Sequence, residues 1–143
     1  MKKEIEIIEK LIKNPRASYA EIAKSLNLSP ETVRQYLQRI LKNKTLELHC
    51  VPDNRYLGKR RCTLVLSVPM DSKVQVVEKL KKIPQTLELR SGVLNPSVIM
   101  DVVTSDVDAT TNELLKLLKN LGVEVREIFE SEHVYFNAGA MLE

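Results

Sequence analysis

The side chains of this chain best suited to bind a ligand lie between positions 29 and 42, where amide and cationic residues recur at helical spacing. Gln can form paired hydrogen bonds with adenine and Arg with guanine in the major groove, and both Arg and Lys can meet phosphates. A solvated helix face is the alternative for any one of these residues. The candidate contacts to nucleic acid are Ser29, Glu31, Thr32, Arg34, Gln35, Gln38, Arg39 and Lys42.

A helix must place these side chains on one surface. A helical projection puts Glu31, Gln35, Gln38 and Lys42 opposite the core, and Thr32, Arg34 and Arg39 beside them. Ser29 is a good N-cap and Pro30 suits the first helical position, so the helix is predicted from Pro30 to about Lys42. Its inward residues are predicted to be Val33, Leu37, Ile40 and Leu41.

Two shorter helices are predicted to support it. In the first, the apolar spacing of Ile5, Ile8, Leu11 and Ile12 is helical, and the stretch 14–16 ends it. The second helix begins at Ser18, which forms a capping box with Glu21. Its predicted buried stripe is Tyr19, Ile22, Ala23 and Leu26. Asn27 tolerates the left-handed conformation that a tight reversal requires, so the pattern indicates a helix-turn-helix.

Alternating residues after the third helix predict a small β-hairpin. Residues 45–51 read as one strand, 52–54 as a turn and 55–57 as a return strand, which together would make a wing. The basic stretch 59–61 follows and is predicted to be a hinge, serving either as a solvated linker or as a phosphate contact.

Charge divides the chain in the same place. Residues 1–61 carry 14 of the 22 Lys and Arg and 7 of the 19 Asp and Glu, a net charge of +7, whereas the remainder has a net charge of −4. A basic first half can attract a polyanion, of which DNA is the favoured candidate. The predicted domains are 1–58, a DNA-binding winged helix-turn-helix, the hinge 59–61, and 62–143.

Composition limits the class of protein. No apolar run approaches the roughly 18 residues that span a bilayer, and the first residues lack the apolar core of a signal peptide, so we expect a cytoplasmic protein. Cys50 and Cys62 are too few for a metal or disulfide framework and are expected to be buried or half-buried thiols. A disulfide between them is the lesser alternative. The sequence indicates no cofactor and no metal site.

The second half reads as β-α-β-β-α-β, which is the order of a ferredoxin-like unit and makes the fold class α+β. The helices are predicted from two apolar sets, and Asp106 or Asp108 would cap the second helix. The predicted strands cover 62–68, 86–93, 97–104, 123–125 and 133–136. The two helical sets are Val74, Val77, Leu80 and Ile83, and Leu114, Leu117, Leu118 and Leu121.

Two helices can cover only one face of such a sheet. The stretches 64–66 and 98–100 are apolar on both sides, so something must cover the second face, and a second copy of the domain is the economical choice. The tail 135–138 could add an edge strand to that partner.

Several motifs together resemble the Lrp/AsnC family of transcriptional regulators. They are the stretches 18–23 and 28–33, the Leu57-Gly58 pair, and Gly92 between two later strands. The resemblance implies promoter binding by a winged helix-turn-helix joined to a domain that forms dimers, often octamers, through facing sheets. Two-fold symmetry would favour a near-palindromic site with half-sites about 10 base pairs apart.

The resemblance also implies an amino-acid effector held at contacts between dimers. It assigns the ligand role to Gly92, Asn95, Thr104 and Asp106, which could instead only shape a turn, a strand end and a helix cap. Two positions depart from the family: Tyr36 stands where an arginine is usual, and Asn95 stands where an aspartate is common. An amide offers no charge to the ammonium group of an amino acid.

Two other functions are kept as alternatives. A small-molecule sensor without DNA binding would account for Tyr36, and a decarboxylase-like enzyme could use the same fold. His49 and His133 lie in different predicted domains, and no nucleophile motif or pair of carboxylates appears, so we expect no enzyme activity.

Overall fold

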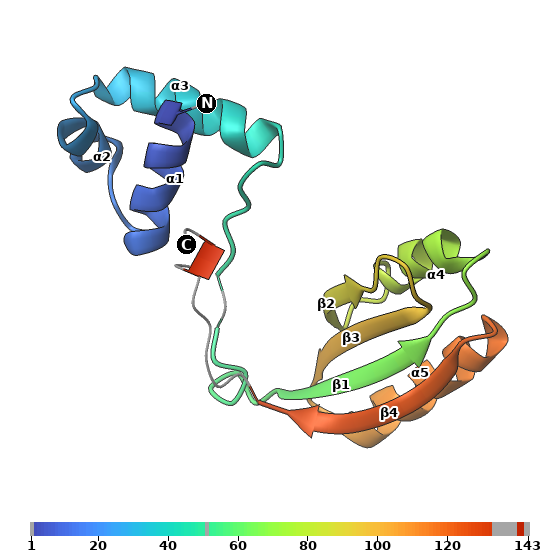
Figure 1. The fold of residues 1–143 in the computed structure, drawn as a ribbon. Helices are drawn as coiled ribbons and strands as arrows, with labels where there is room; N and C mark the ends of the chain where they lie inside the picture. Colours follow the sequence, from blue (N-terminus) through green and yellow to red (C-terminus); the bar gives the residue numbers. More distant parts are fainter. Residues whose placement is uncertain (1, 51, 133–139, 142–143) are drawn as a thin grey trace. The chain divides into compact units, whose positions relative to one another are not determined.

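The computed structural model describes residues 2–50, 52–132 and 140–141, and its chain divides into two compact units (Figure 1). The first unit contains the described residues up to Cys50, together with Ala140 and Met141, and the second unit contains residues 52–132. Among the helices described, none combines the length and the apolarity needed to cross a membrane.

The first unit is a three-helix domain built from α1 (Lys2–Lys13), α2 (Tyr19–Leu26) and α3 (Pro30–Lys42). Its core buries side chains from all three helices, and Ala23, which is almost fully covered, leaves room for the approach of α2 to α3. The buried residues are Ile7, Leu11, Ile22, Ala23, Val33 and Leu37. The core therefore fixes the orientation of α3 by its apolar side.

The predicted inward faces of these helices need three corrections. Ile7 replaces Ile5 in the core, because Leu11 sets the phase of α1 and Ile7 lies one turn before it. Tyr19 and Leu41 were predicted to face inward but are exposed. Both stand near the ends of their helices, Tyr19 at the start of α2 and Leu41 in the last turn of α3.

The wing was predicted as two strands, and none of the described residues in 43–50 or 52–59 forms a strand. The amides of Leu57 and Lys59 instead donate to the carbonyls of Asp53 and Asn54, which closes a turn at Gly58, whose φ is +64°. An isolated two-stranded hairpin is marginal in water without a layer to pack on. Leu48 and Leu57 are more than half exposed, so no such layer covers them in the described chain.

The second unit is the predicted ferredoxin-like domain. Its elements follow in the order β1 (Arg60–Ser67), α4 (Lys73–Leu80), β2 (Thr86–Ser91), β3 (Ser97–Thr104), α5 (Val107–Asn120) and β4 (Glu124–Ser131). The four strands form one sheet in the order β2-β3-β1-β4, and every neighbouring pair is antiparallel. The predicted strand 133–136 and tail 135–138 lie outside the described residues.

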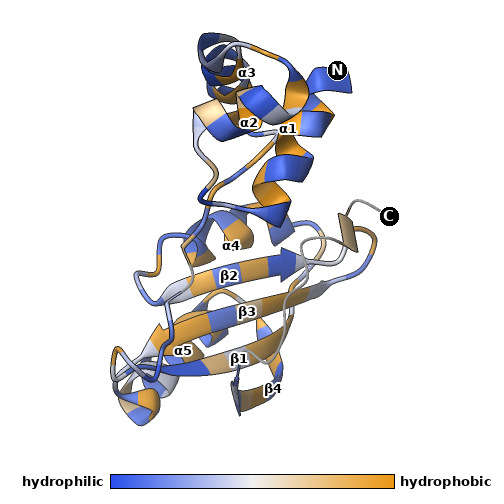
Figure 2. Cartoon of the chain, turned by 90° about the vertical axis from the view of Figure 1, so that its left-hand side faces the viewer, coloured by the Kyte–Doolittle hydropathy of each residue, from blue (hydrophilic) through white to orange (hydrophobic). Residues whose placement is uncertain are grey.

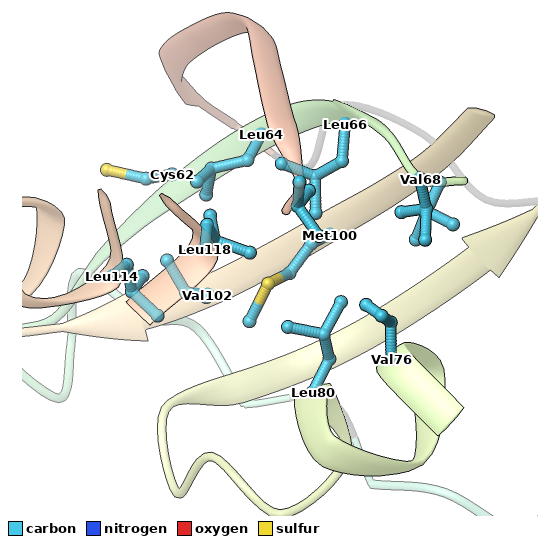
Figure 3. Close-up of a cluster of buried hydrophobic side chains, with 12 residues drawn as sticks. Cys62, Leu64, Leu66, Val68, Val76, Leu80, Met100, Val102, Leu114 and Leu118 are labelled. Carbon is cyan, nitrogen blue, oxygen red and sulfur yellow. The ribbon is translucent and has the colours of Figure 1, made fainter. Parts of the chain in front are cut away.

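The core of this unit lies between one sheet face and the two helices (Figure 3). Leu64, Leu66 and Met100 are fully buried there against Leu80 of α4 and Leu118 of α5. Because side chains alternate along a strand, the residues between them point to the other face. Figure 2 shows the corresponding mixture of hydrophobic and hydrophilic residues along β1 and β3.

The predicted inward side of α4 is largely confirmed, since Leu80 is buried and Val77 and Ile83 pack against the core. Val74 is exposed, whereas Lys73 and Val76 are buried. The ammonium group of Lys73 reaches the loop between β2 and β3 and donates to the carbonyls of Gly92 and Asn95, both at 2.5 Å. In α5, Leu114 and Leu118 are buried as predicted, but Leu117 is exposed.

The hinge was predicted at 59–61, but Arg60 and Arg61 belong to β1 and pair with Thr104 and Val103 of β3. Their guanidinium groups are also engaged: Arg60 donates to Glu130 in a bidentate pair, and Arg61 donates to Asp101. Ion pairs within the sheet therefore account for two of the three charges that suggested a phosphate contact. The prediction for the thiols is half right, since Cys62 is buried and Cys50 is exposed, and both are free.

Candidate nucleic-acid interface

The helix-turn-helix is fixed by caps that use local side chains. Ser18 Oγ accepts from the amide of Glu21 at 3.2 Å, and the Glu21 carboxylate accepts from the amide of Ser18 at 2.6 Å, as a capping box requires. The amide of Ser18, and its hydroxyl group, donate to the Glu21 carboxylate and hold its pKa below the usual value. Asn27 then takes the predicted left-handed conformation with φ 53°. The turn between α2 and α3 is therefore short and defined.

The start of α3 uses two of the predicted contact residues. Ser29 Oγ accepts from the Thr32 amide at 3.0 Å and lies 2.7 Å from Thr32 Oγ1. Both hydroxyl groups thus stabilise the helix start, where backbone amides would otherwise lack partners. Ser29 is exposed and Thr32 is half-buried, so the cap itself lies at the surface.

The other six candidates, Glu31, Arg34, Gln35, Gln38, Arg39 and Lys42, are all exposed on α3. Gln38 and Lys42 stand one turn apart and make no side-chain hydrogen bond or ion pair within the described residues. Both are free to meet an external ligand. The structure therefore brings the predicted set together on one helix, with its apolar side in the core.

Carboxylates engage both arginines of this helix. Glu31 receives a bidentate pair from Arg34, at 2.7 and 2.9 Å, and a bond from Gln35 at 3.2 Å. Arg39 instead turns toward α1, where it pairs with Glu4 at 2.6 Å. Hydrogen bonds from the arginines lower the pKa of both glutamates, so both are ionised at neutral pH.

The sequence pattern did not reveal the environment of Arg39. Its guanidinium carbon lies 5.0 Å from the ring centroid of Tyr36, a distance typical of a cation–π contact. The i, i+3 spacing of Tyr36 and Arg39 could have indicated this contact. Nothing local indicated Glu4, which is 35 positions away. Tyr36 itself is half-buried and packs on the core of the first unit.

The four predicted ligand residues do not meet within one chain. Gly92 and Asn95 precede β3, whereas Thr104 ends it and Asp106 follows. Seven residues of strand separate the two pairs by about 23 Å, at about 3.3 Å per residue. A site that used all four would need more than one copy of the chain.

Each pair also has a structural role. Asn95 Oδ1 accepts from the amide of Ser97 at 2.9 Å, and it would lie 2.0 Å from a Cβ at Gly92, so any larger residue there would displace the Asn95 side chain. At the other end, Thr104 shares a 2.7 Å hydrogen bond with Thr110 and accepts from the Asp106 amide. Asp106 caps α5 through the amide of Ala109.

A hollow of about 250 Å³ lies elsewhere, between the start of α5 and the strands β1 and β4. Its lining residues include none of the four predicted ligand residues; they are Cys62, Val107, Asp108, Thr111, Asn112, Ile128, Phe129 and Glu130. Burial raises the pKa of the Cys62 thiol. The described residues hold no group of three or more His, Cys, Asp or Glu positioned to bind a metal. Of the two histidines, His49 is exposed beside Glu47, and His133 lies outside the described residues.

Comparison with known proteins agrees with this architecture. Residues 2–43 match the family of winged helix-turn-helix DNA-binding domains. No curated protein is similar in sequence to the chain. Solved structures share the fold over almost its whole length. Escherichia coli AsnC has 18% identity and a TM-score of 0.67, with 95% of this chain and 94% of that chain covered.

Two further structures resemble the chain as closely. The leucine response regulatory protein LrpA of Mycobacterium tuberculosis has 14% identity and a TM-score of 0.76, with 95% and 94% of the two chains covered. A transcriptional regulator of Neisseria meningitidis, solved in complex with L-Met, has 15% identity and a TM-score of 0.68, with 96% and 94% covered. Likeness at this level of identity establishes the shared fold, a helix-turn-helix followed by a ferredoxin-like domain.

Proposed function

We propose that this chain is a sequence-specific, DNA-binding transcriptional regulator of the Lrp/AsnC family. The observation that carries the proposal is α3, which is capped, held by its apolar side and exposed along a face of amides and cations. In helix-turn-helix proteins the second helix of the motif, which is α3 here, enters the major groove. The match of residues 2–43 to DNA-binding domains supports it, as does the fold shared with regulators.

In this proposal residues 1–58 form the DNA-binding domain. Residues 62–143 mediate dimerisation and bind an effector. The sheet face opposite the helices supports pairing, because Val65, Ile99 and Val103 lie on it and are only half-buried among the described residues. A dimer would present two copies of α3 to one duplex, and dimers could assemble further into an octamer. The site would be a near-palindrome with half-sites about 10 base pairs apart, and the protein would act in the cytoplasm, where the DNA is.

An amino acid is the proposed effector class, since one structural neighbour is a complex with L-Met. A site built from Gly92 and Asn95 of one copy and Thr104 and Asp106 of another fits the separation of the two pairs. Asn95 brings no charge to such a site, so Asp106 would have to meet the ammonium group.

The test is selection of bound sequences from random duplex DNA, repeated with a panel of amino acids. The variant Gln38→Ala/Lys42→Ala removes two side chains without intramolecular partners in the described structure, so its effect reports on DNA alone. Its matched control is Gln75→Ala/Lys79→Ala on α4, where the same two residue types are exposed at the same spacing.

We expect the α3 variant to lose affinity for the selected site by tenfold or more, because one good base contact contributes about 1–3 kcal/mol. The α4 control should bind as the wild type does. Affinity should also fall steeply with salt, since phosphate contacts release counterions. Equal affinity of the two variants, or selection of asymmetric single sites only, would contradict the proposed mode of binding.

A further inference from the structure

Glu31 is an unusual residue for a surface that must approach DNA. It lies in the first turn of α3, two residues after the N-cap Ser29, and its carboxylate is exposed. Three donors converge on that carboxylate: Nε and Nη2 of Arg34 and Nε2 of Gln35. One acidic group therefore controls the orientation of two predicted base-contacting side chains.

The ion pair between Glu31 and Arg34 is easily broken by a competing ligand. Arg34 and Glu31 retain 45% and 57% of their side-chain exposure, and exposed ion pairs add little to stability because water screens them. DNA can therefore displace Arg34 from Glu31 at small cost. Until that happens, Glu31 partly compensates the charge of Arg34, so a phosphate gains less from meeting Arg34 than from meeting an unpaired cation.

The carboxylate also restricts what can lie opposite it. Phosphates and the acceptor atoms of guanine and thymine are repelled, whereas the exocyclic amino groups of cytosine and adenine can donate to it. The N-terminal residues of a recognition helix are the ones that contact base edges. A charged acceptor at this position lowers the affinity for wrong sequences more than it raises the affinity for the right one.

The rest of α3 does not repeat this arrangement. Arg39 is also paired, but its partner Glu4 belongs to α1, and its guanidinium group lies over Tyr36. Lys42 has no acidic partner in the described residues and remains a general phosphate contact. General attraction to phosphates is thus assigned to Lys42 near the C-terminal end of α3, and selection among base sequences is assigned to Glu31 at its N-terminal end.

We propose that Glu31 is a specificity-determining residue: it holds Arg34 and Gln35 for base contact and excludes sequences without an amino group opposite its carboxylate. The inference rests on the proposed DNA-binding function. It assigns to Glu31 a larger effect on the ratio of specific to random binding than on affinity for the specific site.

The experiment measures affinity for the selected duplex and for a random duplex over a series of salt concentrations. The variants are Glu31→Gln, which removes the charge, and Glu31→Asp, which keeps the charge on a shorter side chain. The matched control is Glu78→Gln on α4, because Glu78 forms the same exposed i, i+3 pair with Lys81, at 2.6 Å. Thermal unfolding of each variant checks that the fold is unchanged.

We expect Glu31→Gln to raise affinity for the random duplex and to lower the ratio of specific to random binding by about tenfold, the discrimination of one base contact. The released Arg34 should add one phosphate contact, so the slope of log affinity against log salt steepens by about 0.9. Glu31→Asp should keep random binding low, and Glu78→Gln should match the wild type.

An unchanged ratio and slope in Glu31→Gln would overturn the inference while leaving the proposed function in place. Equal changes in Glu78→Gln would overturn it too, since the effect would then be one of net charge. A wild-type protein that bound no duplex would overturn both the inference and the proposed function.

Discussion

The two units of the molecule use the same ion-pair chemistry in opposite environments. On α3, Glu31 and Arg34 pair in water, with about half of each side chain exposed. On the sheet, Asp101 is 1% exposed and accepts from Arg61 and Thr63, both at 2.5 Å, and from Arg90 at 3.3 Å. Either residue of the first pair can exchange its partner for an external group. Opening the second pair would instead leave a buried charge without a partner.

The difference follows from desolvation. An exposed pair is screened and gains little, but a buried carboxylate that loses its donors keeps the full cost of its burial. The Asp101 cluster is extended by Ser131, whose hydroxyl lies 2.7 Å from Thr63 Oγ1. Polar side chains are thus held in fixed contacts at the centre of the sheet face opposite the helices, while those of α3 can exchange their partners.

The largest expected effect is therefore on the sheet. Asp101→Ala leaves Arg61, whose side chain is 16% exposed, without its closest carboxylate. We expect the free energy of unfolding to fall by about 3–5 kcal/mol, the usual result of removing one partner of a buried pair. Urea unfolding followed by circular dichroism, at one fixed protein concentration, measures it. A loss below about 1 kcal/mol would show that the cluster tolerates an open charge.

The next effect concerns the anchor between α4 and the loop after β2. Lys73 is 8% exposed, and Lys73→Met removes the two short hydrogen bonds that its ammonium group donates to the carbonyls of Gly92 and Asn95. We expect a loss of about 1.5–3 kcal/mol, typical of hydrogen bonds to charged groups. Lys79→Met, at an exposed position of the same helix, is the control. Equal unfolding curves for the two variants would contradict the anchoring role.

A smaller effect is expected in the first unit, where Ser18→Ala removes one half of the capping box. The cost should be about 1 kcal/mol, as for other N-caps, and should reduce affinity for DNA only through the stability of α2. Chemical unfolding of the first unit provides the measurement. Ser25→Ala, near the end of the same helix, tests whether any lost serine hydroxyl has this effect.

The same cap predicts a pH dependence. The folded pKa of Glu21 is lowered from 4.5 by hydrogen bonds from the backbone and side chain of Ser18. Its contribution is therefore present above about pH 4.5 and is lost as the pH falls through the folded pKa. The stability difference between wild type and Glu21→Ala should shrink over this range, because only the wild type has the carboxylate that accepts these bonds. A constant difference down to pH 3 would show that the Glu21 carboxylate does not take part.

The smallest effect completes the comparison. Glu31→Ala should leave the free energy of unfolding unchanged within error, because the pair it removes is exposed, even though we expect it to alter binding to DNA. The unfolding experiment used for Asp101→Ala measures this variant directly. A clear loss of stability would mean that α3 depends on its surface pairs and would remove the contrast between the two units.

The sequence predicted most accurately the features that are decided locally. The capping box at Ser18, the left-handed Asn27 and the N-cap Ser29 each depend on neighbours within a few residues, and all three are present. The element order of the second unit was also predicted, because each helix and strand has its own periodicity. These features were sufficient to identify the fold.

The features that the sequence missed depend on distant partners. Arg39 meets Glu4 across 35 positions and Arg61 meets Asp101 across 40, and no local pattern records either pair. The prediction of a two-stranded wing was wrong for a related reason. Alternation in residues 45–50 indicates that a strand could form, but a strand also needs a layer to pack against, and that layer is a property of the whole fold.

The two thiols differ in a way that offers an experimental handle. Cys50 is exposed at the junction between the units, while Cys62 is buried in β1 with a raised pKa. Since thiol reagents attack the accessible thiolate, a maleimide dye at neutral pH should attach at Cys50 and spare Cys62. The natural chain would thereby carry a single fluorescent reporter at the point where its two halves join.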